Sequence, residues 1–325
     1  MVKLFRQSVV GQIMVIFLAL AALWAPAFIT PVSVKPSEFF SPLYELVYRL
    51  VFSQPRIAST IALILIIVQG IGLNIMLYNH KMIPANTLMP MFIYIIAMSW
   101  SRDLLTITPM LFVNMMMLPI CHQLLSDGTT KLGFERNFNS AFCIGIASLF
   151  YLPTLCLIVP FLFVFIIYKL YRWRDIIIAI LGLIAPFIVL FTYAFLTDKL
   201  DYFMILIRHD ISDMDFTFDF SNTLSTICCA AFLLLLLMSL FHQLGTQSEN
   251  VNIQRINTSV MVLPLIASVL MSMYTCMFPF DTQLMAPWFA FLATLLILAD
   301  RKRKWISEVM IWIFVLCATI NIWII

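Results

Sequence analysis

Charge is what this sequence has least of. Of its 325 residues, 11% are charged and 63% are hydrophobic, whereas about one quarter of an ordinary soluble domain is charged. Apolar runs such as 9–29 exceed the ~18 residues that a membrane-spanning helix needs. Strand-like segments of about ten residues with alternating hydrophobicity are absent. Because backbone groups in lipid must be hydrogen-bonded within their own segment, the sequence predicts an all-α bundle of transmembrane helices. It also predicts that residues 1–325 form a single integral membrane domain.

Catalytic sequence motifs are scarce as well. The chain has eight glycines and contains no phosphate-binding Gly-rich loop, no nucleophile elbow and no H-E-x-x-H sequence. These absences argue against an ATPase or a soluble nucleotide-sugar enzyme, and no cofactor is expected. The basic residues stand in short loops beside apolar runs, where topology and anionic lipid explain them better than nucleic acid does.

Metal-binding patterns are also missing. The seven cysteines lie within or at the ends of apolar segments without C-x-x-C spacing, which excludes a disulfide framework and a zinc site. His80, His122 and His242 are expected at the inner ends of spans and His209 on the outer side, so the four cannot converge across about 30 Å of hydrocarbon. The three inner histidines could still meet, but no metal site is expected.

The apolar runs predict eleven membrane spans. The first run has about 20 apolar residues, longer than the ~7–15 of a signal-peptide core, so we expect it to remain as a span. The spans are expected at residues 9–29, 57–78, 88–100, 105–121, 139–151, 153–170, 175–197, 224–242, 258–278, 283–299 and 304–325.

Charge predicts the orientation. With a cytoplasmic N-terminus, most of the 19 Lys and Arg residues lie on the inner side and most of the 16 Asp and Glu residues on the outer side. This asymmetry indicates a multi-pass protein of a bacterial inner membrane. It also requires a break near Pro153, because one long helix would place Lys169, Arg172 and Arg174 on the outer side.

The pair Arg102-Asp103 interrupts an otherwise apolar region. The helix predicted at 88–100 covers only about 20 Å of a hydrocarbon core of about 30 Å, so its outer end should lie below the outer surface. Charge at that depth is tolerated only in protein or water-filled surroundings. Two interpretations stay open: the pair lies at the floor of a recess open to the outside, or its two charges neutralise each other in a tight turn.

The first outer loop, 31–56, predicts an amphipathic helix in the outer interface. Ser41 and Pro42 form an N-cap and first-turn pair. Glu45 and Arg49 are four residues apart on the polar side and could simply be an exposed ion pair, while Glu38 has no sequence neighbour to pair with. The apolar stripe consists of Leu43, Leu46, Val47, Leu50 and Val51.

A second outer loop, 198–223, is strongly acidic. Its six aspartates stand at positions 198, 201, 210, 213, 215 and 219. Such a segment could cover the recess as a lid, and carboxylates suit magnesium, calcium or manganese. The spacing matches no calcium-binding loop, so a solvated acidic loop is the favoured interpretation.

Two resemblances follow from this layout. Residues 138–187, "FNSAFCIGIASLFYLPTLCLIVPFLFVFIIYKLYRWRDIIIAILGLIAPF", resemble the most recognisable stretch of an uncharacterised family of bacterial polytopic inner-membrane proteins. The first outer loop with its amphipathic helix and acidic residues, followed by short helices, is similar to the GT-C superfamily of membrane glycosyltransferases. The loop lacks the paired aspartates of many members.

The GT-C resemblance implies transfer of a sugar from a polyprenyl-phosphate donor at the outer face. In that case Arg102 or Arg49 would pair with the donor phosphate, and Glu38, Glu45 or Asp103 would deprotonate the acceptor hydroxyl. Membrane lipids and a polyprenyl-phosphate sugar would be the partners.

Two other classes of protein remain open. A transporter or flippase would place polar groups near mid-membrane, and Asn74 and Asn114 are the main candidates, although hydrogen bonds between helices would also explain them. A non-catalytic subunit of an envelope assembly complex would need only a surface for its partners.

Overall fold

The chain is helical throughout the part that the structure describes. The computed structural model describes residues 9–32, 41–51, 54–83, 87–125, 133–167, 173–202, 204–205, 227, 230, 232–234, 236–238, 262–272, 280–299 and 304–324. Helices make up 89% of it and no described residue belongs to a strand, which confirms the predicted all-α class. Most of the predicted span 224–242 lies outside the described residues, whereas residues 262–272 of the predicted span 258–278 are described and form an apolar helix.

Three helices are long and apolar enough to cross a membrane: α2 (Val9–Ile29), α4 (Pro55–Asn79) and α9 (Trp173–Leu196). At about 1.5 Å per residue, each covers the ~30 Å of a hydrocarbon core. Large apolar side chains stay exposed along them, and on α9 these include Ile176, Ile177, Ile180, Leu181, Ile184, Ile188 and Val189. Such surfaces suit lipid rather than water, and the chain is a membrane protein.

Two broken helix pairs stand where the sequence predicted short spans. In the first, α5 (Met89–Met98) and α6 (Pro109–Leu125) flank the short 3₁₀ helix η1 (Arg102–Leu104). In the second, α7 (Gly133–Phe150) is followed by η2 (Leu152–Leu157) and α8 (Ile158–Ile167). The predicted break near Pro153 is confirmed, since Tyr151 is extended with φ −154° and ψ 104°.

Two helices are longer than the spans predicted from the sequence. Helix α6 continues to Leu125 instead of ending near residue 121, and α7 begins at Gly133 instead of residue 139. The predicted boundaries followed the first polar residues, such as His122 and Asn137. Those residues continue the helix, because a helix satisfies its own backbone bonds in the polar interface as well as in lipid.

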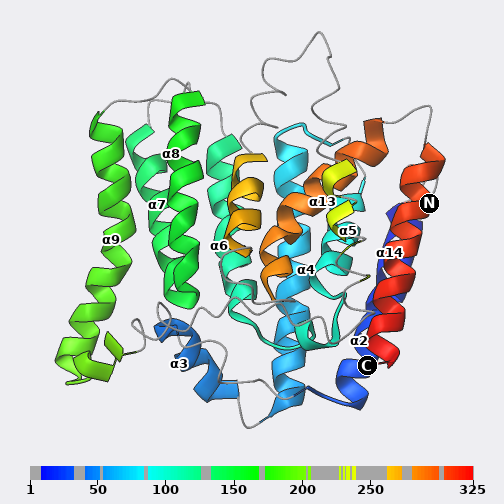
Figure 1. Ribbon diagram of the computed structural model, residues 1–325, viewed down its shortest axis with the longest axis horizontal. Coiled ribbons are helices and arrows are strands. Elements are labelled where there is room, and N and C mark those ends of the chain that lie inside the picture. Colours follow the sequence, from blue (N-terminus) through cyan, green and yellow to red (C-terminus); the bar gives the residue numbers. More distant parts are fainter. Residues whose placement is uncertain are drawn as a thin grey trace.

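The short helix α5 lies at the centre of the bundle, and all ten of its residues are buried. It packs against α4, α2 and the buried helix α13 (Asp281–Ala299), and α13 also contacts α6. Helices α7 and α9 pack together at one edge, and α2 packs with α14 (Lys304–Ile324) at the other (Figure 1).

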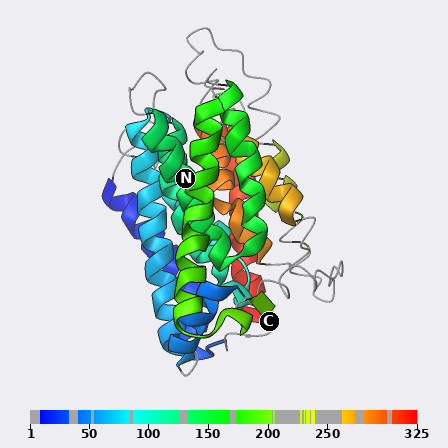
Figure 2. The same ribbon diagram turned by 90° about the vertical axis from the view of Figure 1, so that its left-hand side faces the viewer.

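Polar contacts join the helix termini at the end of the bundle where α3 (Pro42–Val51) lies, which we call the α3 end (Figures 1 and 2). The contacts at this end include Trp24 Nε1 to Ser99 Oγ at 3.1 Å, Trp100 Nε1 to Thr282 Oγ1 at 2.9 Å and Asn321 Nδ2 to the Trp100 carbonyl at 3.1 Å.

The opposite end holds a second set of contacts. The rings of His80 and His122 are 5.1 Å apart between centroids, and Asn137 Nδ2 donates to Asp175 Oδ1 at 3.2 Å. The termini therefore divide between two ends as the predicted topology requires, and two of the three histidines expected at the inner end lie together.

Candidate functional site

Helix α3 is held against the bundle by one buried tyrosine. The predicted helix start is confirmed, because α3 begins at Pro42 directly after Ser41. The buried Tyr44 donates a hydrogen bond of 3.0 Å from its hydroxyl to the carbonyl of Ile107, which follows η1. This anchor joins α3 to the broken α5–α6 pair. On the other side, Leu50 is 82% exposed, as expected of a helix lying in a lipid interface.

Glu45 and Arg49 form the ion pair that their spacing predicted. Arg49 Nη2 and Nε donate to Glu45 Oε1 at 2.6 and 3.0 Å. The Arg49 side chain is 59% exposed and that of Glu45 20%. The hydrogen bond to Glu45 is the main cause that raises the pKa of Arg49 above its usual value, so Arg49 stays cationic.

Tyr202 completes this cluster from a distant part of the chain. Its hydroxyl donates to Glu45 Oε1 and accepts a hydrogen bond of 3.1 Å from Arg49 Nη2. Desolvation first, and then the hydrogen bond to Glu45, raise the pKa of Tyr202 above its usual value. The phenol is therefore protonated and able to donate at neutral pH.

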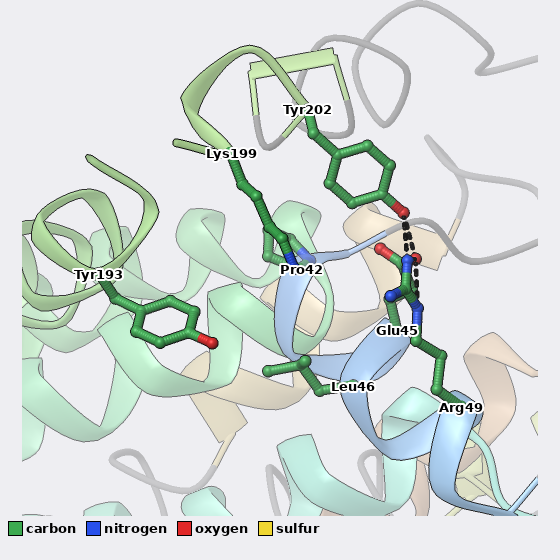
Figure 3. A pocket seen from close by; sticks show the side chains of 7 residues that line it. All are labelled: Pro42, Glu45, Leu46, Arg49, Tyr193, Lys199 and Tyr202. Atoms are coloured by element: carbon green, nitrogen blue, oxygen red, sulfur yellow. Dashed lines mark hydrogen bonds and ion pairs between the residues drawn. The ribbon is translucent and has the colours of Figure 1, made fainter. Parts of the chain in front are cut away.

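The turn after α9 brings Tyr202 to α3. Asp198 adopts a left-handed conformation with φ 50°, and the Lys199 amide donates back to the Ala194 carbonyl at 2.9 Å. Such a turn ends a helix and reverses the chain. The residues after it lie next to the polar side of α3, as Figure 3 shows.

A groove of about 320 Å³ lies between α3 and this segment. Its lining places one carboxylate, two cations and two phenol rings around one space (Figure 3). Among the described residues, the Lys199 ammonium has no hydrogen bond or ion pair. The lining residues are Pro42, Glu45, Leu46, Arg49, Tyr193, Lys199 and Tyr202.

Arg102 and Asp103 lie at the same end but in a different set of contacts. Arg102 Nη2 donates to Thr30 Oγ1 at 2.7 Å and to the Thr30 carbonyl at 3.3 Å, which ties η1 to the end of α2. In the part of the chain that the structure describes, no ion pair joins Arg102 to Asp103. Both side chains are half-buried, and neither lines the groove. Glu38 and most of the acidic loop 198–223 lie outside the described residues.

Buried polar side chains that were not predicted from the sequence form hydrogen bonds at the bundle centre. Tyr94 donates to Gln69 Oε1 at 2.6 Å, and Gln69 Nε2 donates to the Leu111 carbonyl at 2.8 Å. A second branch runs through Gln283, whose Oε1 accepts from Thr108 Oγ1 at 2.6 Å. Gln69 and Gln283 are amide side chains inside two apolar helices, and this pattern could have indicated buried hydrogen bonds.

The asparagines considered for transport have different surroundings. Asn114 Nδ2 donates to the Gln283 carbonyl at 2.8 Å, a hydrogen bond between α6 and α13. Asn74 Oδ1 is buried, and no described residue donates to it.

Among the described residues, no three or more His, Cys, Asp or Glu side chains lie together so that they could hold a metal ion. His209 and His242 fall outside those residues. When the chain is compared with models of protein families, with curated proteins and with solved structures, no match is found.

Proposed function

We propose that this membrane protein transfers a sugar from a polyprenyl-phosphate carrier to an acceptor hydroxyl at the α3 end of its bundle. One observation carries the proposal: a carboxylate and two cations, Glu45, Arg49 and Lys199, line one groove beside the amphipathic helix α3. Transfer from a lipid phosphate needs a base for the acceptor and positive charge for the departing phosphate.

The proposed location is a bacterial inner membrane with the α3 end facing outward. The charge asymmetry of the loops supports this orientation and the eleven-span topology. A carrier whose isoprenyl chain lies in the leaflet would then reach the groove sideways, past the exposed Leu46 and Leu50 of α3. The layout similar to GT-C glycosyltransferases adds to this proposal.

In the proposed reaction, the acceptor oxygen forms a bond to the anomeric carbon while its proton passes to a carboxylate. The bond between the anomeric carbon and the phosphate oxygen breaks, and the phosphate leaves with the electron pair. Glu45 is the base that the groove offers, with Glu38 and Asp103 as the alternatives from the sequence. The groove offers Arg49 and Lys199 as the cations that could stabilise the phosphate, with Arg102 as the alternative from the sequence.

The test compares the lipid-linked and surface glycans of cells by mass spectrometry. Cells lacking the protein are complemented with wild type, Glu45→Gln, Glu38→Gln or Asp103→Asn at equal membrane levels. We expect a sugar to be missing, and its lipid-linked donor to accumulate, in the null strain and in one carboxylate variant.

Glu135→Gln is the matched control, because Glu135 is an exposed carboxylate in the first turn of α7 at the opposite end of the bundle. It should restore the wild-type glycans. An unchanged glycan profile in the null strain would overturn the enzymatic proposal, as would full restoration by all three carboxylate variants.

A further inference from the structure

We infer that the groove is divided into two subsites, a phosphate subsite at Lys199 and a hydroxyl subsite at Glu45 Oε2, with Arg49 as a positioning residue. The inference rests on the proposed function and deepens it. It moves the phosphate-binding role from the two arginines to a lysine that the sequence did not single out. It names the ligand as a lipid phosphate, which is a diester in the sugar donor and a monoester once the sugar has been transferred.

The two oxygens of the Glu45 carboxylate differ in their hydrogen-bond partners. Three donors meet at its Oε1 atom: Arg49 Nε, Arg49 Nη2 and the Tyr202 hydroxyl. No donor from the described residues reaches Oε2. A carboxylate oxygen has two lone pairs, so Oε2 keeps the capacity to accept a hydrogen bond from a ligand hydroxyl and then its proton.

Most of the Arg49 guanidinium is already engaged. Its Nε and Nη2 atoms donate to Glu45, and Nη2 also donates to Tyr202. To take a phosphate with these atoms, Arg49 would have to give up its charge-assisted bonds to Glu45, which leaves only Nη1 for a ligand. We therefore assign Arg49 to holding Glu45 in place and the phosphate to Lys199.

Lys199 is the second cation of the groove. It lines the same groove, and within the described residues its ammonium has no partner. An ammonium is a compact charge with three donors, and lysine commonly binds phosphate in this way. In Figure 3 the Lys199 side chain extends from the segment after α9 toward Pro42, next to the cluster of Glu45 and Arg49. A phosphate here would lie beside the base.

The lining also defines the ligand class. Beside the polar atoms, the groove presents the rings of Tyr193 and Tyr202 and the aliphatic side chain of Leu46. Flat rings with a hydroxyl tip suit a ligand that is partly apolar and partly polar. Residues of the amphipathic helix α3 line the groove. With α3 in the lipid interface, a lipid can deliver its phosphate to Lys199 while its chains stay in the bilayer.

The experiment measures binding to the full-length protein in detergent by native mass spectrometry. The probes are a long-chain isoprenyl monophosphate, the corresponding isoprenyl alcohol, phosphatidic acid and inorganic phosphate. The variants are Lys199→Ala and Glu45→Gln. Arg56→Ala is the matched control, because Arg56 is an exposed cation at the same end of the bundle that does not line the groove.

We expect the isoprenyl monophosphate to bind at least about tenfold more tightly than the alcohol, and Lys199→Ala to remove that preference. Arg56→Ala should bind the monophosphate as tightly as wild type does. Glu45→Gln should also keep phosphate binding, because Glu45 is assigned to the ligand hydroxyl and not to the phosphate. Unchanged phosphate binding in Lys199→Ala, or equal binding of alcohol and monophosphate, would overturn the phosphate subsite.

The results with the different probes distinguish a failure of this inference from a failure of the proposed function. Binding of phosphatidic acid that equals that of the isoprenyl phosphate and depends on Lys199 would support the phosphate subsite and overturn the polyprenyl carrier. Binding of inorganic phosphate alone, with no gain from a lipid chain, would overturn the lipid ligand. If binding behaves as expected but cells lacking the protein have unchanged glycans, the proposed sugar transfer fails and the lipid-phosphate site stands.

Discussion

Gly182 of α9 lies directly against the backbone of Phe138 in α7. A β-carbon added at Gly182 would stand 2.5 Å from the Phe138 carbonyl oxygen, and one added at Gly145 would stand 2.6 Å from the Leu183 carbonyl oxygen. Two glycines on facing helices thus allow α7 and α9 to approach closely. Small residues drive helix association in membranes in this way, since lipid supplies no hydrophobic force between helices.

Gly182→Ala and Gly145→Ala should therefore destabilise the protein, by about 1–3 kcal/mol each, because the obstacle is backbone and cannot move aside. Unfolding of the purified variants in one detergent measures the effect. Gly72→Ala is the control: its nearest neighbour is the flexible end of Leu118, at 3.1 Å, and alanine favours helix by about 1 kcal/mol. Equal stabilities of Gly72→Ala and Gly182→Ala would show that α7 and α9 are not closely packed in the membrane.

These helices show how far the sequence predicts the fold. Apolar length alone predicted α2, α4 and α9. Ser41 and Pro42 predicted a helix start through local backbone geometry, and the charge of the flanking loops predicted the break near Pro153. Helices α6 and α7 continue past the predicted spans to Leu125 and Gly133, since a polar residue in the interface does not end a helix. The approach of α7 to α9 depends on the register between two helices, which composition does not reveal.

The candidate site was also predictable only in part. The Glu45–Arg49 pair is local, four residues apart on one helix, and was predictable from spacing. Tyr202 is 153 positions from Arg49, and its approach follows from the left-handed turn at Asp198. No sequence pattern predicts this turn or the contact that it brings about, so Tyr202 and Lys199 were not predicted as site residues. The roles expected of Arg102 and Asp103 stay predictions, because their contacts say nothing about a ligand.

The buried pair Tyr94–Gln69 should contribute measurably to stability. Tyr94→Phe leaves Gln69 Oε1 without the donor that stands 2.6 Å away, at an expected cost of about 0.5–2 kcal/mol. A double-mutant cycle with Gln69→Leu, followed by unfolding in detergent, should give a coupling energy of about 0.5–1.5 kcal/mol. Tyr193→Phe, which alters an exposed ring on α9, is the control and should unfold as wild type does. A coupling energy of zero would mean that the bond is not formed in the folded protein.

Tyr202 should ionise at a higher pH than an ordinary tyrosine. Desolvation and the hydrogen bond to Glu45 raise its pKa above 10.0. A raised pKa in the folded state means that this contribution to stability is complete below pH ~10 and is lost as pH rises through the folded pKa. The difference between the ultraviolet titrations of wild type and Tyr202→Phe isolates this phenol.

In Glu45→Gln the midpoint of that titration should move down toward 10.0, because the second cause of the shift is removed while desolvation remains. Arg56→Gln alters an exposed side chain outside the cluster and should leave the midpoint unchanged. A Tyr202 midpoint at or below 10.0 in wild type would contradict the cluster seen in Figure 3.

The orientation of the bundle gives the last prediction. Helix α14 ends at Ile324 at the α3 end, whereas α6 ends at Leu125 at the opposite end with His122. The positive-inside rule places the Leu125 end in the cytoplasm and the α3 end outside. Alkaline phosphatase fused after Ile324 should therefore be active, and the same enzyme fused after Leu125 inactive, with green fluorescent protein at the same positions giving the opposite result. If phosphatase were active after Leu125 and inactive after Ile324, the groove beside Glu45 and Lys199 would face the cytoplasm, and a carrier phosphate could reach it only from the inner leaflet.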